Sequence, residues 1–161
     1  MTRRMIILLF DRIATALRWL TALAFGVLLG AVLLQVTTRL ALPTSPVWTE
    51  ELSRFALLYL VALGAGLALR GGELVNVDLL IAALSEASRR RLEAFVMAGI
   101  VVFACVLFPP CWEFVGIGQF QTSPALGWQM TWLHLIVLIA PLSLALFALE
   151  RLVVLLTPAE A

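Results

Sequence analysis

The sequence predicts an all-α integral membrane protein with four transmembrane helices plus short interfacial helices. Hydrophobic residues make up 63% of the 161 residues and the mean hydropathy is +1.06, whereas soluble domains contain about 45–50% apolar residues. Four apolar segments approach or exceed the roughly 20 residues that cross a hydrocarbon layer. Because the connections are short and the composition does not change along the chain, we expect residues 1–161 to form a single four-helix transmembrane domain. Its spans are predicted at about 19–40, 52–69, 92–116 and 129–156.

The N-terminal segment mixes arginines with an apolar run, which favours a short helix lying at the membrane interface over Met1–Arg18. The first span follows from about Trp19 to Leu40. Its Gly26 and Gly30 have the small-xxx-small spacing that supports close helix contact, although small residues are common in spans generally. A Pro-Thr-Ser-Pro turn at 43–46 then predicts a tight connection to the second span.

Charged residues begin the second span. Thr49 is a candidate N-cap, Glu50 and Glu51 suit the positive end of the helix dipole, and Trp48 suits the headgroup level. Arg54 is not explained by the dipole, and it lies on the same helix face as both acids. An unpaired charge at membrane depth costs on the order of 2.5–3.5 kcal/mol, so two interpretations stay open: a local cap, or a polar docking point for another chain.

Small residues dominate the later part of the second span. Close approach by another helix is favoured there because little side-chain bulk stands between the backbones. The residues are Ala62, Gly64, Ala65, Gly66 and Ala68. Arg70, Gly71 and Gly72 are expected to end the span. The loop from Arg70 to Arg91 carries a partly amphipathic pattern, which predicts a second helix lying on the membrane surface.

Prolines interrupt the last two spans. Pro109 and Pro110 predict a bend in the third span, because each removes a backbone donor. Glu113 follows this pair and is expected near the headgroups or against a partner. The fourth span contains Pro141 and ends near Glu150 and Arg151.

The order W-T-E-E-L-x-R, an apolar span with G-A-x-L-A-x-R, and then G-x-x-x-x-V-D resembles the small membrane subunit, or Q subunit (DctQ-like), of tripartite ATP-independent periplasmic (TRAP) transporters. The residues that match are Trp48, Glu50, Glu51, Arg54, Gly64, Arg70 and Asp78. Leu74 departs from the pattern, since a histidine is common there in the family. With the neighbouring Gly66, the matching residues are the candidate partner-interface or structural site.

The resemblance implies a non-catalytic small subunit without a cofactor. It would scaffold a large membrane subunit (M), which carries the substrate and sodium, while a periplasmic substrate-binding protein (P) captures the substrate. The family's substrates are organic acids, including dicarboxylates, sugar acids and sialic acids. Membrane lipids would be the remaining partners.

Arginines gather on one side of the predicted membrane. Nine of the eleven flank the N-terminus, the middle loop or the C-terminus, whereas only Arg39 and Arg54 fall in the opposite loops. The positive-inside rule therefore predicts that both termini and the middle loop are cytoplasmic. The resemblance to TRAP subunits implies that this multi-pass protein lies in the bacterial inner membrane. Four tryptophans then gather toward the opposite face as an aromatic belt, at positions 48, 112, 128 and 132.

Other functional classes find little support in the residues. A net charge of +1 and the absence of a polybasic tail argue against nucleic-acid binding. Cys105 and Cys111 lack the spacing of a redox pair and read as small apolar residues. The lone His134 offers no catalytic partner, although as a single axial ligand it keeps open the alternative of a haem-carrying or other anchor subunit of a respiratory-type complex. A self-sufficient carrier would need polar residues along several spans.

Overall fold

A computed structural model describes residues 2–42, 46–73 and 85–156. They contain α1 (Thr2–Ala41), α2 (Val47–Gly71), α4 (Glu86–Ile117) and α5 (Thr131–Leu156), with a short 3-10 helix, η1 (Gly118–Phe120). Each of the four long helices has the length and composition to cross a membrane. The fold class predicted from the sequence, an all-α membrane protein with four spans, is therefore confirmed.

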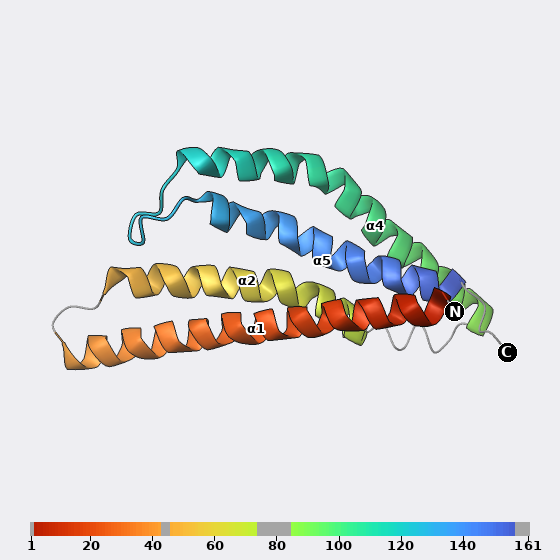
Figure 1. Ribbon diagram of the computed structural model, residues 1–161, viewed down its shortest axis with the longest axis horizontal. Coiled ribbons are helices and arrows are strands. Elements are labelled where there is room, and N and C mark those ends of the chain that lie inside the picture. Colours follow the sequence, from red (N-terminus) through yellow and green to blue (C-terminus); the bar gives the residue numbers. More distant parts are fainter. Residues whose placement is uncertain (1, 43–45, 74–84, 157–161) are drawn as a thin grey trace.

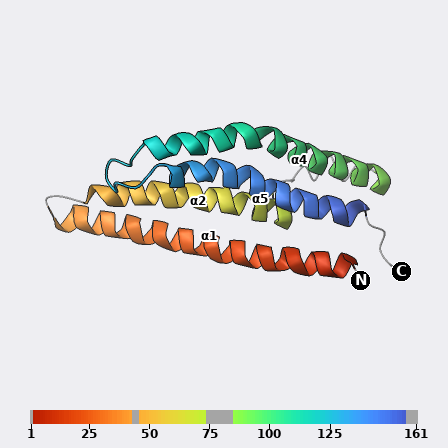
Figure 2. The same ribbon diagram turned by 45° about the horizontal axis from the view of Figure 1, so that its top comes forward.

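The four helices lie side by side in one row, in the order α1, α2, α5, α4 (Figures 1 and 2). Extensive contacts join α1 to α2, α2 to α5, and α5 to α4, while α1 and α5 touch only slightly. The two ends of the chain lie at the same end of the row. A single row leaves much of its apolar surface without a neighbouring helix, and large apolar side chains such as Trp19 (74% exposed) and Phe95 (77% exposed) are uncovered.

The separate interfacial helix predicted over Met1–Arg18 is not seen, because α1 continues without a break from Thr2 into the first span. The physical reason is that no proline or glycine precedes Gly26, so nothing in this segment stops an α-helix. The second predicted surface helix, in the 70–91 loop, lies largely outside the described residues. The part of that loop from Glu86 onward belongs to α4, which begins after Ser85, and the Ser85 hydroxyl accepts a hydrogen bond from the Ser88 amide.

The start of α2 differs from the prediction that Thr49 is its N-cap. The helix begins at Val47, with Pro46 as the extended cap residue. The Thr49 side chain is fully buried, and its hydroxyl donates to the Pro46 carbonyl at 2.7 Å. Thr49 therefore stabilises the first turn from inside the helix. At the other end, Gly72 adopts φ = 77°, a left-handed conformation that favours glycine and ends α2 where the sequence predicts.

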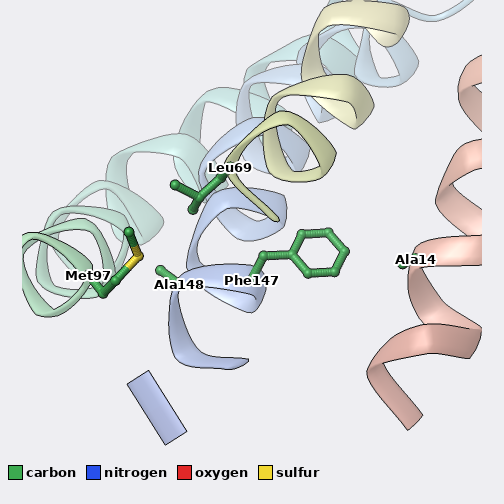
Figure 3. Packing of buried hydrophobic residues seen from close by; sticks show 5 residues of the cluster. All are labelled: Ala14, Leu69, Met97, Phe147 and Ala148. Atoms are coloured by element: carbon green, nitrogen blue, oxygen red, sulfur yellow. The ribbon is translucent and has the colours of Figure 1, made fainter. Parts of the chain in front are cut away.

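The contact between α2 and α5 depends on two small residues. A Cβ atom on Gly66 would lie 2.5 Å from the Ser143 carbonyl oxygen, so the two backbones approach closely only because Gly66 has no side chain. The Ser143 hydroxyl donates to the Ala62 carbonyl, one turn before Gly66, at 2.8 Å. In Figure 3, Phe147 extends from α5 toward Ala14 of α1, and Leu69 and Met97 lie beside Ala148.

The helix α4 is curved (Figure 1). Pro109 and Pro110 lie inside it, as predicted, and each removes one hydrogen bond from its ladder. At its end, Gly118 packs so closely on the start of α5 that a Cβ there would lie 2.6 Å from the Thr131 amide nitrogen. The connection between these two helices is thereby held against the first turn of α5.

Candidate functional site

Arg70 joins three helices at the end of the row that carries both chain termini. One of its terminal nitrogens (Nη2) lies 2.6 Å from Asp11 Oδ1 of α1 and 2.8 Å from Glu150 Oε1 of α5. Its guanidinium carbon also lies 5.6 Å from the centre of the Phe147 ring, within the range of a cation–π interaction. Arg70 is 20% exposed and the Glu150 side chain 11%, so this pair is largely shielded, whereas the Asp11 side chain is 53% exposed. The three residues Asp11, Arg70 and Glu150 are called the ionic hub below.

Two further contacts fasten α4 to α5 at the same end. The Arg151 Nε atom lies 2.5 Å from Glu93 Oε1. Arg90 donates from Nε to the Leu155 carbonyl at 3.1 Å, and its Nη2 contacts the same oxygen. Every helix of the row is thus joined to a neighbour by a charged side chain near the termini.

Glu51 makes a different contact at the opposite end of the row of helices. Its Oε2 atom accepts hydrogen bonds from the amides of Ala125 at 2.9 Å and Leu126 at 3.1 Å. The Leu126 amide also donates to the hydroxyl of Ser123, which is 3% exposed. Glu51 therefore attaches α2 to the connection between α4 and α5, 74 residues further along the chain.

The predicted three-residue cluster is consequently divided. Arg54 Nη2 lies 3.4 Å from Glu50 Oε1, and both side chains are well exposed, at 66% and 60%. Glu51 engages the distant connection instead. Trp48, in the first turn of the same helix, is 40% exposed. A weak, open pair of this kind contributes little to the stability of the chain itself.

The two candidate glycines of α2 have different surroundings. Gly66 is buried against α5, within this same chain. Gly64 has no heavy atom within 4 Å of the place where its Cβ would stand. Asp78 lies outside the described residues.

His134 is buried among its neighbours. Its ring stacks on Phe114 with 4.0 Å between ring centroids, and Nδ1 lies 2.9 Å from the Phe114 carbonyl oxygen, to which the protonated nitrogen donates. On the side of α5 that faces α2, the Tyr59 hydroxyl donates to the Trp132 carbonyl. These contacts give His134 and Tyr59 packing roles between helices.

Sequence reasoning singled out Arg70 but missed the carboxylates that bind it. The sequence predicts an interfacial segment around Asp11 and places Glu150 near the end of the fourth span, without a partner for either. The cost of an unpaired charge at membrane depth predicts that each of these residues has an oppositely charged partner, but it does not identify that partner. Only the neighbour relations of α1, α2 and α5 identify the pairs.

The family model described as "Tripartite ATP-independent periplasmic transporters, DctQ component" matches residues 28–157. A curated relative, the sialic acid TRAP transporter permease protein SiaT of Haemophilus influenzae (strain 86-028NP), is 30% identical over 88 residues. That similarity covers 55% of this chain and 14% of the relative, so the chain matches only a small part of that protein's length.

Proposed function

The chain belongs to the DctQ component family of TRAP transporters, and from that premise we propose that it is a non-catalytic small membrane subunit that scaffolds a large transport subunit. In this proposal the large subunit carries the substrate together with sodium, and a periplasmic binding protein delivers the substrate. The substrate is an organic acid; the relative named for sialic acid supports this class.

The observation that carries the proposal is the single row of helices. A carrier surrounds its substrate with helices from at least two sides, whereas a row has no interior between two layers (Figures 1 and 2). The polar contacts of the described residues lie mostly near the two ends of the row. The broad apolar faces are suited to lipid and to another membrane protein.

We further propose the orientation that the arginines favour, with both termini in the cytoplasm of a bacterial inner membrane. The ionic hub then lies at the cytoplasmic end of the row. The connection between α4 and α5, attached by Glu51, lies at the periplasmic end, where the exposed aromatic residues Trp48, Phe120 and Trp128 also stand.

The exposed pair of Glu50 and Arg54 is our proposed docking point for the large subunit. Since the pair stabilises this chain little, its two charges near the end of an apolar helix are explained better by a partner that buries them. Arg54→Ala should weaken co-purification of the large subunit while leaving the thermal stability of the isolated chain unchanged. Arg39→Ala, at the exposed end of α1, is the matched control; equal retention of the large subunit by both variants would exclude this docking point.

Reconstitution tests the function as a whole. Liposomes that contain only this chain should take up no organic acid. Uptake should appear when a large subunit and a binding protein are added, and it should require an inward sodium gradient. Liposomes with the large subunit and binding protein but without this chain provide the control. Uptake by this chain alone would refute the scaffold proposal, and sodium-independent uptake by the full set would refute the coupling.

A further inference from the structure

An open groove of about 600 Å³ runs between α1 and α2 at the end of the row that carries the termini. Its lining combines charged, hydroxyl and small side chains from both helices. The residues are Asp11, Arg18, Thr21, Gly64, Leu67, Ala68, Arg70, Gly71 and Glu73. Asp11 and Arg70 of the ionic hub line the groove, whereas Glu150 does not, and the groove is separate from the Glu50–Arg54 pair at the other end of α2.

Small residues on α2 keep the groove open. Gly64, Ala68 and Gly71 are spaced by four and three residues, so they share one helix face and present almost no side chain to α1. A Cβ on Gly64 would meet nothing within 4 Å. The space beside Gly66 is occupied by the backbone of α5, whereas the space beside Gly64 is empty.

Arg18 supplies a positive charge inside the groove. It lies seven residues beyond Asp11 along α1, which places it about 10 Å deeper along the helix axis at 1.5 Å per residue. Among the described residues, no hydrogen bond or ion pair reaches its guanidinium group. An unpaired cation at that depth favours binding of an anionic group.

Negative charge surrounds the outer end of the same groove. Arg70 lines the groove there, but its charge is already balanced by the buried Glu150, which does not belong to the lining of the groove. Asp11 uses only Oδ1 to bind Arg70. Glu73 adds a carboxylate that folds over Gly71, with Oε1 at 3.6 Å from the position of a Cβ there. This end therefore favours a cation.

We propose that the groove binds the headgroup of a zwitterionic aminophospholipid, with its phosphate on Arg18 and its ammonium group at Asp11 and Glu73. The order of charges fits, because the phosphate of such a lipid lies nearer to the hydrocarbon than the ammonium group does, and Arg18 lies deeper than the two acids. The acyl chains would lie along the exposed apolar surface of α1 at Leu20 and Leu23. A partner side chain carries only one of the two charges, so a lipid matches the lining better.

Native mass spectrometry of the purified full-length chain tests the proposal. The chain is incubated with equal amounts of phosphatidylethanolamine, phosphatidylglycerol and phosphatidylcholine that carry identical acyl chains. Phosphatidylethanolamine should be retained preferentially, since phosphatidylglycerol lacks the cation and phosphatidylcholine has no N–H donors. Arg18→Gln should reduce its retention about tenfold, as expected for loss of one charge-assisted contact. Arg12→Gln, on the same helix but outside the groove, should have no effect.

Filling the groove gives a second, independent test. Gly64→Leu should prevent retention of the lipid, while Gly26→Leu, at an exposed and equally open position of α1, should not. Circular dichroism of each variant confirms that the helices are intact. The proposal is overturned if phosphatidylglycerol or phosphatidylcholine is retained as well as phosphatidylethanolamine, or if Arg18→Gln and Arg12→Gln bind lipid equally.

Discussion

Arg70 shows how one side chain can hold a thin membrane protein together. It binds Asp11 of α1 and Glu150 of α5, two helices that otherwise touch only slightly. Without Arg70, two carboxylates would face each other with no cation between them. The shielded position of Glu150 makes that loss costly, because a buried charge then lacks its partner.

Arg70→Gln should therefore lower the free energy of unfolding in detergent by roughly 3 kcal/mol, the usual cost of breaking a shielded ion pair. Asp11→Asn should cost less than about 1 kcal/mol, because the Asp11 side chain is 53% exposed. Chemical unfolding followed by circular dichroism measures both changes. Equal effects of the two variants would mean that Glu150 is not the main partner of Arg70.

Glu50 and Glu51 are adjacent in sequence, which makes them a matched pair. Glu51→Ala removes the acceptor for the Ala125 and Leu126 amides, so hydrogen exchange at these two amides should become several-fold faster. Glu50→Ala should leave their exchange unchanged, since among the described residues the Glu50 carboxylate contacts the exposed Arg54 and not this connection. Slower or unaltered exchange in Glu51→Ala would show that the connection between α4 and α5 is held by other contacts.

At the scale of the helices, the apolar composition of the chain predicted the number of helices better than hydrophobic periodicity predicted where they begin. The four long apolar runs led to four helices, and Gly72 ended α2 where expected. The start of α2 was missed because Thr49 has the residue type of a cap but uses its hydroxyl as a donor inside the helix. The continuity of α1 was missed because the charge of Asp11 and Arg12 suggested an interface, although charge alone does not end a helix.

The position of each helix among its neighbours could not be derived from the sequence. Hydropathy does not distinguish a helix face that contacts another helix from one that contacts lipid. The small residues on α2 are likewise compatible with a helix contact on either side. The structure assigns Gly66 to α5 and leaves Gly64 open. The same physical limit hid the partners of Arg70, which come from helices 59 and 80 residues away in sequence.

Alanine at Gly66 and alanine at Gly64 should have different effects on stability. Gly66→Ala places a methyl group 2.5 Å from the Ser143 carbonyl oxygen, so α2 and α5 must separate, at a cost of about 1–3 kcal/mol. Gly64→Ala meets nothing and should be neutral or slightly stabilising, because alanine favours the helix. Thermal unfolding in detergent compares them. A greater loss of stability in Gly64→Ala would contradict the assignment of the two faces.

At the scale of the whole molecule, the orientation can be tested with single cysteines after Cys105 and Cys111 have been replaced. Cysteine at Gln121, which is exposed in the connection after η1, should react with an impermeant thiol reagent added outside intact cells. Cysteine at Ala87, near the start of α4, should react only after the membrane is opened. Ser123 is a poorer labelling site than Gln121, because it is 3% exposed. The reverse labelling pattern would invert the proposed orientation.

The order of the helices in the row also suggests how the chain inserts into the membrane and assembles. The pairs α1–α2 and α4–α5 are each consecutive in sequence, and α2–α5 is the principal seam between them. Each pair can thus enter the membrane as a helical hairpin during synthesis, before the other exists, and the seam at Gly66 and Ser143 closes afterwards. Fragments 1–73 and 85–161, produced as separate chains in one cell, should therefore co-purify, and Gly66→Leu in the first fragment should separate them. Assembly of this subunit would then be the association of two separately formed helical hairpins, in which the close approach at Gly66 lets Arg70 reach Glu150 and Glu51 reach the connection between α4 and α5.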